Sequence, residues 1–280
     1  MNTETATRVA PNSLPPLSEV AAELVATLSR DTTHGADLAR LVARDPVLAG
    51  ATLKLANSSF FGLAGRVSSM HDAVTLIGFS AVRNMLLIMS MRGALRPPPD
   101  VMDSQAMWLH ALETAAAARA LARANGLSGD EAFLAGLLHD LGKLVLACTS
   151  PDAARSVARH AQDNRCSYGE AESALGVTSH ESAGVALAVA WRLPSVLALA
   201  MSHHHAPMPD DPLLVHVVHL ANVIAHVARC DDAKPEPAPP IRMLSWQRLV
   251  PSESDLERAV TAARRMRQGA GEWRALLDET

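Results

Sequence analysis

Apolar residues recur at the spacing of an α-helix along most of this chain. The first clear stripe lies between residues 17 and 28, and its members follow one another at helical steps: Leu17, Val20, Ala21, Leu24, Val25 and Leu28. No stretch alternates apolar and polar residues convincingly, as a half-buried strand would. Although 49% of the residues are apolar, only 3% are aromatic, so Ala, Leu, Val and Met must build the core, which favours helices over sheet. We therefore predict an all-α fold.

Prolines and capping residues indicate where the helices begin. Asp45-Pro46 and Asp211-Pro212 each resemble a capping aspartate followed by a proline in the first turn, and Ser128 with Glu131 forms a capping-box pattern. The predicted helices span 17–29, 35–43, 46–57, 70–77, 80–94, 104–124, 129–147, 152–165, 180–191, 195–204, 212–229 and 254–276.

Proline-rich segments indicate the domain organisation. The sequence RPPPD at 96–100 cannot continue a helix, so we expect it to separate an N-terminal helical block, 14–98, from a second block, 101–230. A Pro-rich loop is predicted at 231–253, followed by a C-terminal helix within 254–280.

Composition restricts the class of protein. The formal net charge of −4 shows no overall basic excess of the kind that dominates nucleic-acid affinity, so no nucleic-acid partner is expected. Three cysteines, Cys148, Cys166 and Cys230, have neither CxxC spacing nor an even count, which indicates a reducing compartment. The N-terminus lacks a secretory signal, and the apolar run at 85–91 is too short to span a bilayer. We expect a cytoplasmic protein with no membrane partner.

Histidines next to an aspartate are the strongest chemical signal in the sequence. His139 and Asp140 lie in GLLHDLGK, and on a helix neighbouring side chains are about 100° apart, so both can reach one ion. Imidazole and carboxylate suit Zn, Fe, Mn or Ni. Other predicted helices carry His110, His180 and the run His203–His205, of which we favour His204 as the inward residue and His203 as second. The alternative is a hydrogen-bonded polar network without an ion.

Several longer stretches resemble one protein family. In the first block they are LPPLSEVAAELV, LARLVARDPVLAGATLKLANSSFFGL and SSMHDAVTLIGFSAVRNMLL. In the second block they are AFLAGLLHDLGKLVL, ESALGVTSHESAGVALAVAWRLP and ALAMSHHHAP. Residues 14–226 resemble the HDOD domain, an output-type branch of the HD superfamily of metal-dependent phosphohydrolases. The resemblance implies an N-terminal helical block packed on an HD-type helical core, so that residues 14–230 form one HDOD domain.

The resemblance also implies roles for single residues. In catalytic relatives the positions that match His110, His139, Asp140, His180 and His204 bind metal, and the position of Lys143 lies near the substrate phosphate. A final acidic ligand is replaced by Asn222, and the GYP-type segment after the histidine run is absent. Two divalent ions would face a single carboxylate, Asp140, which is costly in a partly buried site. We therefore expect a degenerate centre with at most one ion, which is Fe, Zn, Ni or Mn.

Two functions from different classes remain open at this stage. We expect mainly a bacterial signal-transduction protein without strong catalysis, whose partners are a sensor kinase, a response regulator or a cyclic-dinucleotide enzyme. The alternative is a metal-dependent phosphohydrolase or phosphodiesterase acting on a nucleotide or cyclic dinucleotide, with Lys143 as its candidate catalytic residue. Some of these residues also have a purely structural interpretation. Lys143 would favour the negative end of its helix, and His216, His219, Asn222 and His226 would form an ordinary buried helix face rather than a second metal patch.

Overall fold

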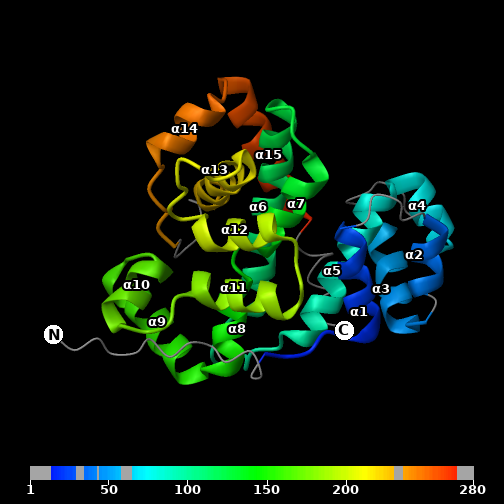
Figure 1. Cartoon of the computed structure of the whole chain (residues 1–280), viewed down its shortest axis with the longest axis horizontal. Coiled ribbons are helices and arrows are strands. Elements are labelled where there is room, and N and C mark those ends of the chain that lie inside the picture. Colours follow the sequence, from blue (N-terminus) through cyan, green and yellow to red (C-terminus); the bar gives the residue numbers. More distant parts are fainter. Residues whose placement is uncertain (1–13, 30–34, 43, 58–64, 230–235, 270–280) are drawn as a thin grey trace.

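The computed structural model describes residues 14–29, 35–42, 44–57, 65–229 and 236–269 of the chain. Within these residues the fold is all-α, as predicted, and contains no strand. Figure 1 shows two helical blocks side by side, with the last two helices of the chain at one end of the larger block. This arrangement matches an N-terminal block packed on an HD-type core.

The N-terminal block is built around one largely buried helix. Its elements are α1 (Glu19–Ala26), the short 3-10 helix η2 (Thr27–Ser29), α2 (Gly35–Val42), α3 (Pro46–Ala56), α4 (Met70–Ile77) and α5 (Phe79–Ala94). Helices α1, α3 and α4 all pack against α5. The apolar run at 85–91 lies on α5, and its residues Leu86, Leu87 and Ile88 are completely buried. This middle part of α5 is apolar on nearly all sides and must be covered, and the neighbouring helices do this.

The larger block contains the candidate site. Its helices are α6 (Ser104–Ala124), α7 (Gly129–Leu138), α8 (Leu141–Thr149), α9 (Pro151–Asn164), α10 (Tyr168–Leu175), α11 (His180–Ala190), α12 (Ser195–His203) and α13 (Leu213–Val227). The long helix α6 packs against α7 and α13, while α8 packs against α11 and α11 against α12. One continuous apolar core runs through both blocks. Between them the indole Nε1 of Trp191 donates a hydrogen bond of 3.0 Å to the carbonyl of Pro15.

The C-terminal part differs from the expected loop and helix. Helix α14 (Met243–Leu249) lies inside the segment that we predicted to be loop, and α15 (Glu253–Gln268) packs against α6. Residues 270–280 of the predicted C-terminal helix lie outside the described residues. An ion pair ties α15 to the core, because Nη1 of Arg267 lies 3.9 Å from Oε1 of the fully buried Glu113. Oε2 of Glu113 lies 2.7 Å from Nε of Arg229, which follows α13. The short helix α10 was also not predicted, since its sequence is polar and only 8 residues long.

The boundaries of two predicted helices need correction. The helix expected over 129–147 is two helices, because Asp140 leaves helical geometry with φ −106° and ψ 8°. Asp211 does not cap the helix at 212–229. Its carboxylate accepts hydrogen bonds from the backbone N–H of Met208 and from Nδ1 of His203, and α13 starts without a side-chain cap. The predicted caps at Asp45 and Ser128 are present, since both accept backbone N–H groups of their helices.

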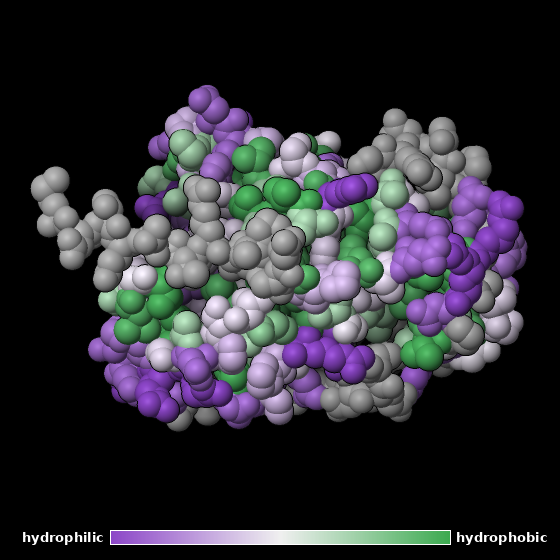
Figure 2. All heavy atoms as spheres, turned by 60° about the horizontal axis from the view of Figure 1, so that its bottom comes forward, coloured by the Kyte–Doolittle hydropathy of each residue, from purple (hydrophilic) through white to green (hydrophobic). Residues whose placement is uncertain are grey.

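One segment is apolar enough to be considered for a membrane. By length and composition Gly129–Thr149 could cross a bilayer, but 89% of its most apolar window is buried inside the molecule, as in the core helix of a soluble protein. On the face shown in Figure 2, hydrophobic side chains form separate patches among hydrophilic ones. The fold is therefore compatible with a soluble protein.

Candidate metal centre

The break between α7 and α8 places His139 and Asp140 at the centre of the larger block. A close approach of two helices then sets His180 beside them. A Cβ atom added to Gly142 on α8 would lie 1.8 Å from the backbone oxygen of His180 and 2.8 Å from the backbone nitrogen of Gly184 on α11. Only glycine allows this approach. The motif HDLGK thus supplies both the polar pair and the small residue that lets α11 reach it.

Four imidazoles surround the carboxylate of Asp140. Oδ1 lies 3.4 Å from Nε2 of His180 and 3.3 Å from Nε2 of His204. Oδ2 lies 3.3 Å from Nε2 of His139 and 3.8 Å from Nε2 of His110. All five residues are buried. The structure therefore brings together the five side chains that the resemblance implied as metal ligands.

The outer nitrogens of three rings are already occupied. Nδ1 of His139 donates to the carbonyl of Gly136 at 2.7 Å, and Nδ1 of His204 donates to the carbonyl of Met201 at 3.0 Å. Nδ1 of His180 lies 2.7 Å from Oε2 of Glu172. Metal-binding histidines use their second nitrogen in this way, because the bond fixes the ring and the tautomer. In the neutral rings, the Nε2 lone pairs then point at the centre.

The centre contains polar atoms without hydrogen-bond partners. These atoms are Oδ1 of Asp140, Nε2 of His139, Nε2 of His204 and both nitrogens of His110, while Oδ2 of Asp140 pairs with Nζ of Lys143 at 2.7 Å. Buried polar atoms that have no partner are costly, and lone pairs that converge at this spacing repel one another. A divalent cation would accept the lone pairs that face the centre, so this donor set fits a transition metal.

Electrostatics also keep three of the donors in their metal-binding forms. Burial lowers the pKa of His204 to about 3 and that of His110 well below its usual value. Burial raises the pKa of Asp140, but Lys143 and His139 outweigh it, so this pKa lies well below its usual value. For His180, burial is outweighed by the bond to Glu172 and the field of Asp140, which raise its pKa. Neutral His110, neutral His204 and ionised Asp140 are forms that bind cations, whereas a protonated His180 would have to release its Nε2 proton to do so.

The donors form two overlapping groups. In one, Asp140, His180, His204 and His205 offer ligand atoms within 4.8 Å of one another, and in the other His110, His139 and Asp140 do so. Asp140 belongs to both. His205 was not predicted as a ligand, yet its Nε2 lies 3.1 Å from Nε2 of His180.

The run of three histidines divides differently from our expectation. We placed His203 second to His204, but His203 lies outside both groups, with its Nδ1 2.9 Å from Oδ1 of Asp211. Helix α12 ends at His203, so His205 no longer follows helical geometry and can turn inward beside His204. A helical projection could not show this, because it depends on where the helix ends.

Lys143 lies at the edge of the centre. Its Nζ is 2.7 Å from Oδ2 of Asp140 and 5.2 Å from the centre of the Tyr168 ring. Because the chain breaks at Asp140, Lys143 occupies the first turn of α8. The interpretation that it favours the negative end of a helix is therefore wrong, since this end carries the positive pole.

The polar residues on one face of α13 make different contacts. His216 contacts Ser245 and Arg248 through its two nitrogens. His219 donates to the carbonyl of His204 at 2.7 Å. These two residues connect parts of the chain, as expected of a buried helix face.

The other two residues of this face, Asn222 and His226, bear on the candidate metal centre. The ring of His226 lies 4.6 Å from that of His110, so His226 borders the centre. Asn222 is buried, and neither its amide nitrogen nor its amide oxygen has a hydrogen-bond partner. Its role as a weaker ligand stays a prediction.

Glu172 is the acidic residue that sequence reasoning missed. It is 1% exposed and also accepts the backbone N–H of His180 at 2.8 Å. Our charge count gave the centre one carboxylate, and the structure adds a second carboxylate one bond away from a donor ring. The signal was a glutamate 8 residues before a candidate histidine, but it could be used only with knowledge that the turn after α10 brings Glu172 to the start of α11.

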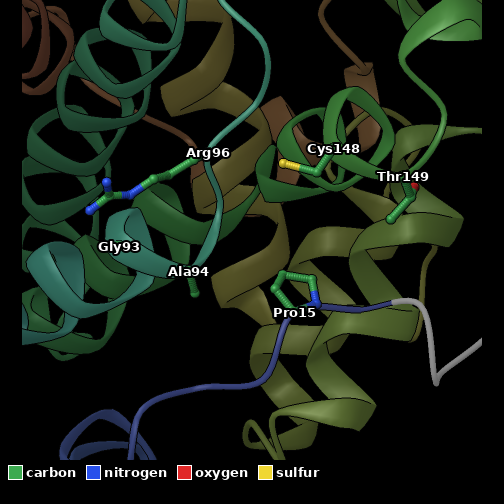
Figure 3. A pocket seen from close by; sticks show the side chains of 6 residues that line it. All are labelled: Pro15, Gly93, Ala94, Arg96, Cys148 and Thr149. Atoms are coloured by element: carbon green, nitrogen blue, oxygen red, sulfur yellow. The ribbon is translucent and has the colours of Figure 1, made fainter.

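A separate hollow lies at the junction of the two blocks. Figure 3 shows it between Pro15, the end of α5 at Gly93 and Ala94, and the end of α8 at Cys148 and Thr149. Helix α8 has 9 residues, and at about 1.5 Å per residue this hollow lies about 12 Å from Asp140. It is therefore not part of the candidate metal centre.

Comparisons with known proteins agree with this fold. An uncharacterized protein of Treponema pallidum is 27% identical over 247 residues, which are 85% of this chain and 47% of that protein. The chain thus spans about half the length of this curated relative.

Solved structures include proteins with two kinds of assignment. A protein of Marinobacter aquaeolei assigned to signal transduction is 27% identical with a TM-score of 0.78, over 92% of this chain and 59% of that chain. An HDOD domain protein of unknown function from Geobacter sulfurreducens is 24% identical with a TM-score of 0.73, over 95% of this chain and 93% of that chain. A protein of Shewanella amazonensis assigned as a phosphohydrolase is 22% identical with a TM-score of 0.68, over 90% of this chain and 96% of that chain. The last two likenesses concern the fold alone.

The family assignment rests on the match to a whole domain. The sequence pattern of the HDOD domain matches residues 14–207, which cover the N-terminal block and the core helices through α12. The match includes the break at Asp140, the close approach at Gly142 and the histidines at the end of α12. This chain belongs to the HDOD domain family.

Proposed function

We propose that this protein is a bacterial regulatory protein of the cytoplasm, that it acts through contacts with signalling proteins, and that its buried centre holds one divalent transition metal. The observation that carries this proposal is the group Asp140, His180, His204 and His205. Four protein ligands complete the coordination of a closed, structural site, whereas catalytic sites keep one position open. An ion held in this group would stabilise the fold.

Such an ion would fasten several helices at one point. Its ligands come from the start of α8, the start of α11 and the end of α12. Binding energy at a site that exists only in the folded chain is folding energy. Metal occupancy would therefore control how rigidly these helices are held together. Their outer surface is the one that a partner would contact. This gives a metal centre a regulatory role without catalysis.

The partners expected for such a protein are a sensor kinase, a response regulator or a cyclic-dinucleotide enzyme. The similarity to a structure assigned to signal transduction supports this class of partner. This chain covers 59% of that structure's chain, so the activity of that whole protein is not transferred here. No nucleic-acid or membrane partner is proposed, in keeping with the absence of a basic excess in the composition.

A second candidate is metal-dependent phosphoester hydrolysis. The group His110, His139 and Asp140 offers three protein ligands, which leaves a position open as in catalytic sites. An ion there would supply Lewis acidity. Lys143, which lies beside Asp140, would hold an oxygen of the phosphate, and the substrate would be a nucleotide or a cyclic dinucleotide. The replacement of an acidic ligand by Asn222 speaks against this candidate.

Elemental analysis of protein purified without an affinity tag or chelator tests the metal. We expect about one Fe, Zn, Ni or Mn per chain and a lower melting temperature after chelation. The variant His204→Ala should lose the metal, whereas His71→Ala, at an exposed position of the N-terminal block, should keep it. Wild-type protein that contains no metal and does not respond to chelation would contradict the metal centre.

Two further measurements separate the two functions. Hydrolysis of a panel of phosphate esters and cyclic dinucleotides should be absent in the metal-loaded protein, and turnover that is lost in Asp140→Ala would establish the hydrolase instead. Crosslinking in the native bacterium should connect the protein to signalling proteins, and less so for His204→Ala. Crosslinks that are absent from the wild type would contradict the regulatory role.

A further inference from the structure

A Pro-rich segment reaches the edge of the metal centre from outside the matched family region. Residues 236–242 lead into α14, and Figure 1 shows this orange segment descending from α14 toward α10. Its residues Pro237, Pro239 and Pro240 restrict the backbone to extended conformations. The segment is therefore stiff, and holding it in one place costs less conformational entropy than holding a flexible loop.

Both ends of this segment are attached near the centre. The backbone N–H of Arg242 donates to Nε2 of His219 at 3.0 Å, and Nε of Arg242 donates to the carbonyl of His205 at 3.2 Å. Nδ1 of the same His219 donates to the carbonyl of His204. At the other end Oε1 of Glu236 accepts the backbone N–H of Tyr168 at 3.3 Å. The segment thus spans from the carbonyls of two donor histidines to the start of α10, and we call it the strap.

Glu236 brings a negative charge to the place where Lys143 lies. The residue as a whole is exposed, but its carboxylate is turned toward Tyr168, whose ring lies 5.2 Å from Nζ of Lys143 and 5.9 Å from the ring of His180. Burial raises the pKa of Glu236, but Lys143 and His226 outweigh it and lower this pKa. Glu236 is therefore ionised, and the positive charge of Lys143 attracts it.

We propose that Glu236 is an internal carboxylate that occupies the anion-binding edge formed by Lys143 and the backbone N–H of Tyr168, so that a phosphate-type anion must displace the strap to bind there. The inference rests on the proposed function, because it names a ligand class for the edge of the same centre. A carboxylate and a phosphate oxygen use the same donors, a backbone N–H and an ammonium group. The strap lies on the surface of the core, so its release would turn anion binding into a change that a partner protein can detect.

Binding of inorganic phosphate, measured by isothermal titration calorimetry at pH 7.5, tests the proposal. Glu236→Gln keeps an oxygen for the N–H of Tyr168 but removes the charge, and we expect it to bind phosphate at least tenfold more tightly than the wild type, equivalent to about 1.4 kcal/mol. Glu257→Gln on the exposed face of α15 makes the same change of net charge away from the strap and should bind like the wild type. Lys143→Met added to Glu236→Gln should remove the gain.

Several results would overturn the proposal. Equal phosphate affinity of Glu236→Gln and the wild type would do so, as would phosphate binding by neither protein. A gain of the same size in Glu257→Gln would mean that net charge alone is responsible. Metal content measured on the same samples keeps the two questions apart. If the protein contains metal but Glu236→Gln does not change phosphate affinity, only the proposal for the strap is refuted. If the purified protein contains no metal but Glu236→Gln still increases phosphate affinity, only the metal centre is refuted.

Discussion

The close contact between α8 and α11 at Gly142 predicts the effect of adding a single methyl group there. A Cβ atom at Gly142 would lie 1.8 Å from the backbone oxygen of His180, whereas real Cβ atoms essentially never approach below 3.0 Å. The substitution Gly142→Ala must therefore separate α8 and α11 locally by about 1.2 Å. The obstacle is backbone on both sides, so a side-chain rotation cannot relieve it.

The size of this displacement determines two expected results. Overpacking of a core contact costs about 1 to 3 kcal/mol, which lowers the melting temperature of a chain of this size by about 2 to 10 °C. Metal–ligand distances tolerate only about 0.2 Å, and His180 moves relative to Asp140 when the helices part. Gly142→Ala should therefore lose most of its metal, whereas the metal-free variant should show the loss of stability alone.

Urea unfolding and elemental analysis of the same preparations check both results. The matched control is Gly93→Ala on α5, where an added Cβ meets no atom within 4 Å. A helical Gly→Ala change at such a position stabilises by about 0.4 to 1 kcal/mol. If Gly142→Ala kept both the stability and the metal content of the wild type, the packing of α8 on α11 would not control the donor geometry, and the reasoning would be refuted.

Three further predictions concern other contacts of the site and the core. Glu172→Gln should lower metal affinity about 10- to 100-fold, because Glu172 orients the ring of His180; competition with a chelator measures it, and unchanged affinity would contradict this role. Metal-free protein should lose about 1.4 kcal/mol of stability from His204 alone between pH 7.5 and 5.5, since the pKa of this residue is about 3 when folded and about 6.5 when unfolded. Protonation then favours the unfolded chain as the pH falls, and urea unfolding of wild type and His204→Gln should differ in this slope. Arg229→Ala should cost about 3 kcal/mol, because it leaves the carboxylate of Glu113 buried without its closest partner; denaturant unfolding that shows less than about 1 kcal/mol would contradict it.

Much of the site could be anticipated from short segments of sequence. His139, Asp140 and Lys143 come from one motif, and the match to a family assigned His110, His180 and His204 to the same point. The errors arose at the ends of helices. The break at Asp140 places Lys143 in the first turn of α8 instead of the interior of a long helix. Because α12 ends at His203, His205 turns toward the centre and His203 does not. Periodicity describes a helix well in its middle and poorly at its ends.

The sequence by itself determined the helical class of this protein, its family and five donors of the candidate centre, because helical periodicity and motif spacing are local properties. Tertiary structure alone decided which acidic groups join the donors. Glu172 reaches His180 because the turn after α10 brings it to the start of α11, and Glu236 reaches the start of α10 across 68 residues. Such contacts depend on how distant helices pack, and no short stretch of sequence contains that information. The charge of the centre, and with it the choice between a structural metal and a catalytic one, is for this reason a property of the folded chain.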